Sequence, residues 1–231
     1  MDRTGTMETA PLGPVVDSSP ALLPQRIRLE GNYVCLVPLS ASEHGDDLWA
    51  GVGGRGNDEL WRYLFAGPFF DRNDFDGYLA LKAASEDQAF YTIVDQPSGR
   101  SQGVASLMRI EPIHRVIEVG NILYSRSLQR TRGATEAMYL LAKYSFETLG
   151  YRRYEWKCND LNAASRKAAL RLGFSFEGVF RQHMIIKGRN RDTSWFSLLD
   201  SEWPERKRAF ERWLDPANFD PHGRQKTPLR F

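Results

Sequence analysis

Apolar and polar residues alternate along several stretches of this chain, with the period of two expected of strands that bury one face. The longest alternation runs from Ile113 to Tyr124, and a second from Tyr151 to Cys158. Gly120 interrupts the first, which predicts either a β-bulge or a close backbone approach, and a bulge would exchange the two faces beyond it. Further strands are predicted at 33–37, 89–94, 103–110, 174–186 and 192–199. Polar turns at 96–100 and 187–190 join the last four of these into two hairpins.

A helical period dominates the stretch from Ala134 to Leu149, where apolar residues recur at i, i+3 and i+4. Gly150 closes this helix, and Gly173 closes a shorter one that begins near Asn162. Other helices are predicted at 41–50, 74–85 and 205–214. This element order predicts an α+β domain with a mixed, mostly antiparallel sheet of about seven strands. One parallel crossover spans the long helix.

The two ends of the chain lack such periods. Residues 1–24 are rich in Ser, Thr, Pro and Gly and are predicted to form a disordered tail. The domain is then expected to cover residues 25–214, and residues 215–231 to form a polar C-terminal tail.

A basic turn, Gln129 to Ala134, joins the strand 118–124 to the long helix. The unpaired N–H groups and the positive dipole end of a helix N-terminus attract anions. The turn is therefore either an anion site or an ordinary surface turn of a βαβ unit. The cleft at the carboxyl end of a parallel strand pair is the expected place for a ligand.

Composition narrows the classes of function. The 231 residues carry a net charge of only +2, which does not favour nucleic acid, and no apolar run is long enough to span a membrane. The two cysteines, Cys35 and Cys158, lie in predicted strands and indicate reduced thiols in a reducing compartment. We therefore expect a cytoplasmic protein that binds neither nucleic acid nor membrane. His and Cys show no metal-ligand spacing, so no metal is expected.

Several short motifs, in order, resemble the Gcn5-related N-acetyltransferase (GNAT) superfamily, in particular its branch of ribosomal-protein N-acetyltransferases. They are Gln129 with Ala134 and Thr135-Glu136-Ala137, Glu118-Val119-Gly120, Asn162-x-x-Ser165, Leu172-Gly173-Phe174, Glu177-Gly178, and Leu60-Trp61-Arg62-Tyr63 with Gly67-Pro68. The resemblance covers roughly residues 27–203. Arg132 stands where the family pattern places its first Gly, which raises the question of whether cofactor binding is weakened.

The resemblance implies transfer of an acetyl group from acetyl-CoA to an amine by direct attack in a ternary complex. The residues it assigns to acetyl-CoA are Leu123, Tyr124, Gln129, Arg130, Thr131, Arg132, Gly133, Ala134, Thr135 and Asn162. Glu118 is expected to act as the base, directly or through a water, and Ser165 as the acid for the leaving thiolate. The family's usual Tyr acid is replaced by Ala169. His114 and His183 are alternative bases.

The acceptor is left open between a small amine and a protein N-terminus. Residues expected on the acceptor side are Trp61, Tyr63, Phe70 and His183. The protein is expected to be a monomer or a homodimer. An alternative hypothesis is a non-catalytic module that binds acyl-CoA, and nucleic-acid binding through the basic turns is a more distant one.

Overall fold

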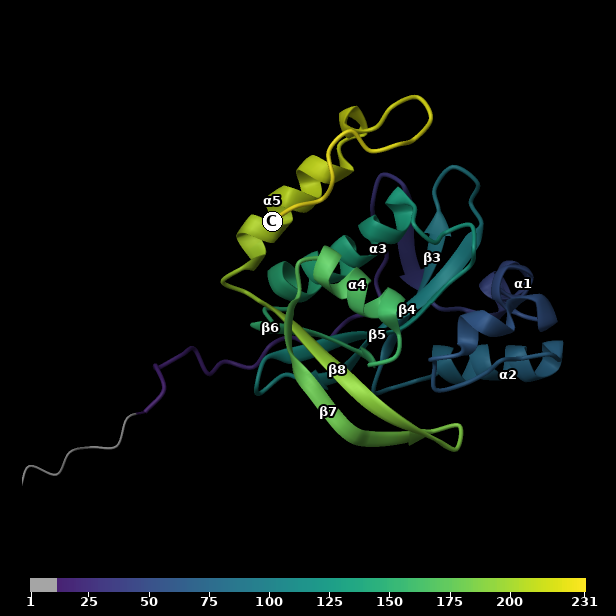
Figure 1. Ribbon diagram of the computed structural model, residues 1–231, viewed down its shortest axis with the longest axis horizontal. Coiled ribbons are helices and arrows are strands. Elements are labelled where there is room, and N and C mark those ends of the chain that lie inside the picture. The colour runs from purple at the N-terminus through teal and green to yellow at the C-terminus, as the bar shows by residue number, and fades with distance from the viewer. Residues whose placement is uncertain (1–11) are drawn as a thin grey trace, which may run out of the picture.

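The computed structural model describes residues 12–231 and is built on one eight-stranded sheet (Figure 1). Its strands lie in the order β1-β2-β3-β4-β5-β6-β8-β7. They are β1 Leu29–Glu30, β2 Val34–Pro38, β3 Ala89–Asp95, β4 Ser101–Glu111, β5 Val116–Tyr124, β6 Arg153–Asn159, β7 Ser175–Ile186 and β8 Arg189–Leu199. Only β5 and β6 pair in parallel. The predicted α+β class is confirmed. The two-residue β1 was not predicted because it is too short to show alternation.

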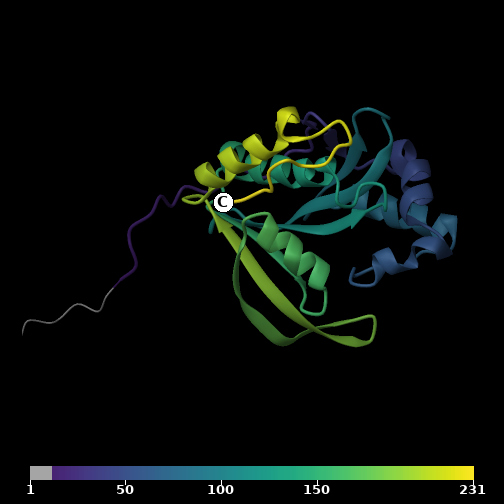
Figure 2. The same cartoon turned by 45° about the horizontal axis from the view of Figure 1, so that its top comes forward.

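Five α-helices accompany the sheet in the described residues: α1 Ala41–Val52, α2 Arg72–Ala83, α3 Arg132–Lys143, α4 Ala163–Arg171 and α5 Trp203–Leu214. A π-helical turn, Tyr144–Thr148, continues α3 to the predicted stop at Gly150. Short 3-10 helices cover Arg55–Trp61 and Pro216–Asn218. In Figures 1 and 2, α3 and α5 lie along one side of the sheet, while α1 and α2 sit at its β3–β4 end and the β7–β8 hairpin projects away.

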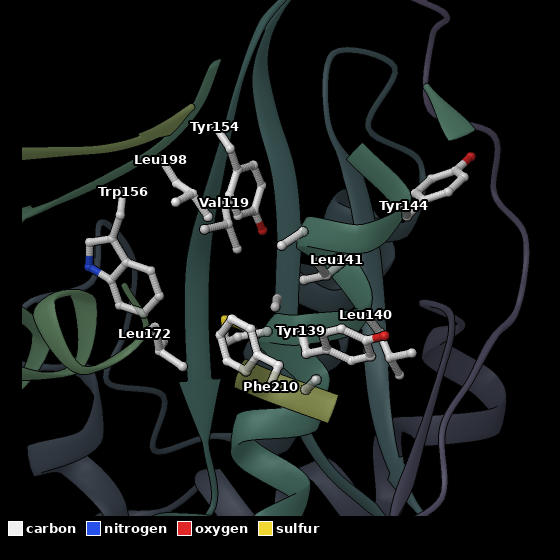
Figure 3. Packing of buried hydrophobic residues seen from close by; sticks show 14 of the residues in the cluster. Val119, Tyr139, Leu140, Leu141, Tyr144, Tyr154, Trp156, Leu172, Leu198 and Phe210 are labelled. Carbon is white, nitrogen blue, oxygen red and sulfur yellow. The ribbon is translucent and has the colours of Figure 1, made fainter. Parts of the chain in front are cut away.

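The main core fills the space between the sheet and the helices α3 and α5 (Figure 3). Val119 of β5 and Tyr154 of β6 lie opposite Leu141 of α3, and Phe210 of α5 packs beside Tyr139. Burying one side chain of this size contributes about 1.5–3 kcal/mol.

A second, smaller core lies under α1 and α2. It contains Leu48 and Phe75 from these helices, and Phe90, Val104 and Leu123 from β3, β4 and β5. Both faces of this part of the sheet are therefore covered.

The bulge predicted near Gly120 is present in β5. Ser106 pairs with Gly120 but Val104 pairs with Leu123, so β5 carries one extra residue, and Asn121 takes a φ of 51°. As a result Val119 faces the main core and Leu123 the second core. The exchange of faces is thus confirmed.

The parallel pairing of β5 with β6 is short. It begins at Val116 opposite Arg153 and ends at Val119 opposite Trp156. Beyond that point β5 pairs only with β4, and β6 only with β8. The edges of Gly120–Tyr124 and Lys157–Asn159 that face each other therefore have no ladder hydrogen bonds to one another. The two strands therefore part here, and we call the opening between these unpaired edges the cleft.

Two sequence expectations need comment. The strand predicted up to Tyr124 is confirmed from Val116 on, but its start at Ile113 was wrong, because residues 112–115 form a turn in which Arg115 has a φ of 55°. His114 is exposed in that turn. Cys35 and Cys158 are buried free thiols, and burial raises the pKa of both.

The terminal segments pack on the domain where the structure describes them. Residues 12–24 contain no helix or strand, but the N–H of Leu22 donates to the carbonyl of Leu149 at 2.9 Å. After α5, Phe219 and Leu229 are buried, and Trp213 donates to Gln225 at 2.8 Å. Residues 1–11 of the expected N-terminal tail lie outside the described residues. Among residues 12–231, no helix has the length and apolar character to cross a membrane.

Candidate active site

The N-terminus of α3 opens at the mouth of the cleft. Thr131 caps the helix by accepting the Ala134 N–H at 3.1 Å, and Arg130 before it takes a φ of 62°. The backbone N–H groups of Arg130, Arg132 and Gly133 make no hydrogen bond within residues 12–231. Free N–H groups at a helix N-terminus are the features that a diphosphate requires. The cofactor assigned by the resemblance therefore fits this turn.

The side chain of Arg132 points away from that anion site. Its guanidinium carbon lies 4.5 Å from the ring centroid of Tyr33 and 4.7 Å from that of Phe219, so it sits between two aromatic faces. An added Cβ on Gly133 would stand 2.7 Å from Val34 Cγ1. Gly133 thus lets α3 approach β2. Arg132 in place of the family's Gly does not fill the turn.

Two neighbours in the Thr-Glu-Ala motif are tied to other elements. Thr135 accepts from Arg171 of α4 at 3.1 Å. The buried carboxylate of Glu136 accepts three backbone N–H groups, from Asn32, Tyr33 and Val34, at 2.7, 2.7 and 2.8 Å. These contacts join α3 to α4 and to the loop before β2. The motif therefore stabilises the base of the site.

The strand residues assigned to the acyl group lie on the open part of β5. Leu123 is buried in the second core, and the hydroxyl of Tyr124 donates to the carbonyl of Ala134 at 3.3 Å. Burial raises the pKa of Tyr124 far above its usual range. Gln129 donates from its side chain to the Tyr124 carbonyl at 3.2 Å. This contact fixes the turn against the end of β5.

Asn162 and Ser165 stand together at the N-terminus of α4. Asn162 Oδ1 accepts the Ser165 N–H at 3.1 Å and caps the helix. Ser165 Oγ accepts from Trp156 Nε1 at 3.0 Å, which leaves the Ser165 hydroxyl proton free to donate. Trp156 is the last β6 residue paired with β5, so Ser165 lies where the cleft begins.

Glu118 is part of a row of alternating charges that crosses the sheet. The row consists of Arg109, Glu118, Lys157, Glu155, Arg153 and Glu177. Glu118 Oε2 contacts Arg109 Nη1 at 2.6 Å and Lys157 Nζ at 2.8 Å. Both side chains of the Glu118–Lys157 pair are 4% exposed. Glu118 Oε1 makes no hydrogen bond within the described residues. That oxygen is available to a ligand.

His183 belongs to the same neighbourhood. Its Nδ1 lies 3.0 Å from Thr193 Oγ1, and its ring packs edge-on against Phe180. Desolvation first, and then the charges of Arg109, Arg191 and Lys157, lower the pKa of His183, while Glu118 raises it. The imidazole is therefore neutral at pH 7 and can accept a proton.

The aromatic residues expected on the acceptor side occupy different surroundings. Trp61 is buried in the second core and donates from Nε1 to the Val52 carbonyl at 2.7 Å. Tyr63 donates to the Leu161 carbonyl at 3.2 Å, and Lys187 donates to the Trp61 carbonyl at 2.9 Å. Phe70 is 51% exposed.

The segment between the 3-10 helix and α2 therefore contacts both the β6–α4 loop and the β7–β8 hairpin. Beside this segment lies a pocket of about 200 Å³. It is lined by Leu64, Phe65, Ala66, Tyr78, Lys82, Gln88, Met108 and Asn121.

Sequence reasoning did not single out Arg109, Lys157 or Arg191, which surround Glu118 and His183. For Lys157 a signal was present, because it shares a strand face with Glu155 and lies across from Glu118. The burial of Arg191 has no such signal. No group of three or more His, Cys, Asp or Glu side chains in residues 12–231 is arranged to hold a metal ion.

Known proteins are similar to this chain in sequence and in fold. Over 101 residues the chain is 31% identical to the ribosomal-protein-serine acetyltransferase of Escherichia coli, covering 43% of this chain and 56% of that relative. The chain thus spans just over half the length of this relative. It spans 57% of the length of a second relative, named "Putative ribosomal N-acetyltransferase YdaF", from Bacillus subtilis. A GCN5-related N-acetyltransferase from Brucella melitensis has 47% identity and a TM-score of 0.89, covering 91% of this chain and 96% of that one.

A probable GNAT-family acetyltransferase from Chromobacterium violaceum has 43% identity and a TM-score of 0.77, covering 84% of this chain and 98% of that one. The acetyltransferase (GNAT) domain family matches residues 34–175, which include the α3 turn, Glu118, Asn162 and Ser165. The resemblance seen in the sequence is confirmed: the chain belongs to the GNAT acetyltransferase domain family.

Proposed function

We propose that this protein transfers an acetyl group from acetyl-CoA to an amine. The observation that carries the proposal is the opening of the sheet between β5 and β6, with the free N–H groups of α3 at its mouth. A thioester arm can lie between two strand edges that offer unpaired backbone groups, with its diphosphate at the helix N-terminus. Membership of the GNAT family supports the same reading.

Each residue near the cleft then has a role in binding. The N–H groups of Arg130, Arg132 and Gly133 hold the diphosphate, with the exposed Arg130 adding charge. The backbone of Leu123 and Tyr124 holds the arm and the carbonyl oxygen, where N–H donors stabilise developing negative charge. Asn162 keeps its Oδ1 on the α4 cap, so its Nδ2 is the group left to donate to the arm. Acetyl-CoA supplies the activated acyl group.

Proton transfer requires a base for the ammonium and an acid for the thiolate. Glu118 Oε1 accepts the ammonium proton, directly or through a water, so that the neutral amine forms the new C–N bond as the C–S bond breaks. The other oxygen of Glu118, Oε2, is already held by Arg109 and Lys157. His183, neutral at pH 7, is the second candidate base. Ser165 donates its hydroxyl proton to the thiolate.

The acceptor side favours a small amine over a protein N-terminus. The pocket beside β4 and β5 holds about 200 Å³, and Trp61, at the end of the 3-10 helix, is bound to the β7–β8 hairpin through Lys187. The Escherichia coli relative is named for a ribosomal protein, which keeps a protein N-terminus as the second candidate. We also infer a cytoplasmic location from the two buried free thiols, and binding to neither nucleic acid nor membrane.

The test is a thermal-shift titration with acetyl-CoA, with CoA and ATP as controls, followed by thiol-release assays with amines. A ligand that binds only the folded state raises the melting temperature by mass action. We expect acetyl-CoA and CoA, but not ATP, to raise it, and amines to release thiol. Binding without thiol release for any small amine or peptide would favour the non-catalytic acyl-CoA module. No shift at millimolar acetyl-CoA would refute the proposal.

A further inference from the structure

Arg191 of β8 is a buried cation with almost no partner. The residue is 6% exposed, and its Nε is buried without a hydrogen bond. Its Nη1 donates to Met184 Sδ at 3.2 Å, and Nη2 makes no hydrogen bond within residues 12–231. The ring of Phe65 lies 5.0 Å from the guanidinium carbon. No protein acceptor in the described residues therefore binds the edge of the guanidinium formed by Nε and Nη2.

Nearby carboxylates are already committed to other groups. Glu118 is bound by Arg109 and Lys157, and the row of charges to which it belongs balances three cations against three carboxylates. Asp192, next in the chain, accepts from the Gln182 N–H at 2.7 Å and from Asn190 at 3.0 Å. Arg191 is thus an additional positive charge in this region. A buried charge without a counter-ion is strongly unfavourable.

Arg191 also faces the acceptor side of the site. Burial first, and then the charge of Arg109, lower its pKa, while Cys158 and Glu118 raise it. Arg191 pairs across the hairpin with Met184, the residue after His183, and its charge lowers the pKa of His183. Phe65, which covers the guanidinium, is at the same time a wall of the 200 Å³ pocket. A ligand in that pocket therefore contacts the ring that packs on Arg191.

We propose that the acceptor is a small amine that carries a carboxylate, and that Arg191 binds this carboxylate through its vacant Nε–Nη2 edge. This inference rests on the proposed acetyl transfer. A guanidinium presents two parallel N–H groups on this edge, which match the two oxygens of a carboxylate. Phe65 holds the guanidinium plane, and Glu118 Oε1 remains free for the amine. The site would thus bind the two charges of an amino-acid-like acceptor at separate groups.

Matched acceptor pairs separate a carboxylate requirement from general amine reactivity. Thiol release from acetyl-CoA would be measured with L-methionine, L-phenylalanine and β-alanine, each against its carboxamide. The variants are Arg191→Met, which keeps an unbranched side chain but removes the guanidinium, and Arg189→Met. Arg189 lies two residues away on the same strand and is exposed, so it controls for loss of charge on the hairpin.

We expect kcat/KM for the best carboxylate to exceed that of its amide by at least about tenfold. Arg191→Met should remove this preference by lowering kcat/KM for the acid much more than for the amide, while Arg189→Met should keep it. The melting temperature of Arg191→Met without ligand should be equal or higher, because an unpaired buried charge is gone. The N-acetylated product acids, but not their amides, should raise the melting temperature of the wild type saturated with CoA.

Three results would overturn the inference while leaving acetyl transfer intact. The first is equal turnover of acids and amides by the wild type. The second is an equal loss of turnover with acids and with amides in Arg191→Met, together with a lower melting temperature. The third is a peptide with an acidic N-terminus that is turned over faster than every small carboxylated amine. Failure of the proposed function is recognised separately, because acetyl-CoA then gives no thermal shift. In that case a melting-temperature rise by the product acids alone, absent in Arg191→Met, still supports the carboxylate site.

Discussion

Ser165 shows how one hydrogen bond can define a residue's role. Its oxygen accepts from Trp156 Nε1, which orients the hydroxyl and leaves its own proton to be donated. A serine in the first turn of a surface helix is usually inert. The structural reason to treat this one differently is its place beside the last paired residue of β6.

Replacing Ser165 by Ala should lower kcat on the order of 10²-fold while the Kd for acetyl-CoA stays nearly constant, because only the proton donor is lost. Steady-state thiol release and calorimetric titration measure the two effects. Trp156→Phe is the matched control, since it removes the donor to Ser165 but keeps the hydroxyl. If both variants lose activity equally, Ser165 acts through packing and not as the acid.

Asn162 has two functions that a single substitution can separate. Asn162→Asp retains an oxygen to cap α4 and adds a charge that the helix dipole favours, but it loses the Nδ2 donor. We therefore expect an unchanged or higher melting temperature and acetyl-CoA binding weakened about tenfold, the loss of roughly one hydrogen bond. Asn162→Ala should lose both, with about 1 kcal/mol less stability. Unchanged acetyl-CoA affinity in the Asp variant would remove Asn162 from the binding site.

Arg191 marks the limit of prediction at the residue scale. The sequence indicated Glu118, Ser165 and the turn before α3, because motif spacing and strand alternation are local signals. The burial of Arg191 depends on Phe65, more than a hundred residues earlier, which closes over the hairpin from the segment before α2. No periodicity in the chain reports such a contact.

At the scale of elements, strong local patterns were read correctly and short or irregular ones were not. The helix through Leu141, the two hairpins and the bulge near Gly120 follow from periodicity and from turn residues. The two-residue β1 and the π-helical turn after α3 have no such pattern. Gly133 was predicted only as a phosphate-binding residue, and its missing side chain also serves the contact between α3 and β2.

That contact can be tested by a double-mutant cycle. Gly133→Ala should destabilise the fold by about 1–2 kcal/mol, because the new Cβ meets Val34 Cγ1 at 2.7 Å and a β-branched core residue cannot turn away. Val34→Ala removes that methyl. The double variant should be more stable than the sum of the two single changes predicts, by about 1 kcal/mol or more, in denaturant unfolding. Strict additivity would show that α3 shifts freely.

At the scale of the whole molecule, the row of alternating charges joins five strands, from Arg109 on β4 to Glu177 on β7, which also accepts from Ser197 of β8. Strands that diverge at the cleft are thus held together on the acceptor face. The row as a whole could not be derived from sequence, because Glu177 of β7 reaches Arg153 of β6 across the intervening β8. The Arg153–Glu177 pair at the end of this row makes the stability of the sheet depend on pH.

The pKa of Glu177 determines in which direction the free energy of unfolding changes with pH. The hydrogen bonds from Arg153 are the main cause that lowers the pKa of Glu177 from 4.5 to about 2. The carboxylate is thus favoured in the folded state, and its contribution is complete above the unfolded pKa. It is lost as the pH falls from about 4.5 towards 2. Because the Glu177 side chain is 39% exposed, solvent screening reduces this contribution to about 1–2 kcal/mol.

Glu177→Gln should therefore be less stable than the wild type at pH 7 and equally stable near pH 2, so its stability falls less steeply between these values. Urea unfolding at a series of pH values measures both curves. Glu86→Gln is the control, because Glu86 is exposed and makes no hydrogen bond within residues 12–231. Curves for Glu177→Gln and wild type that stay parallel down to pH 2 would mean that the Arg153–Glu177 pair contributes nothing to the fold. The row of charges would then serve only to orient Glu118 in the site.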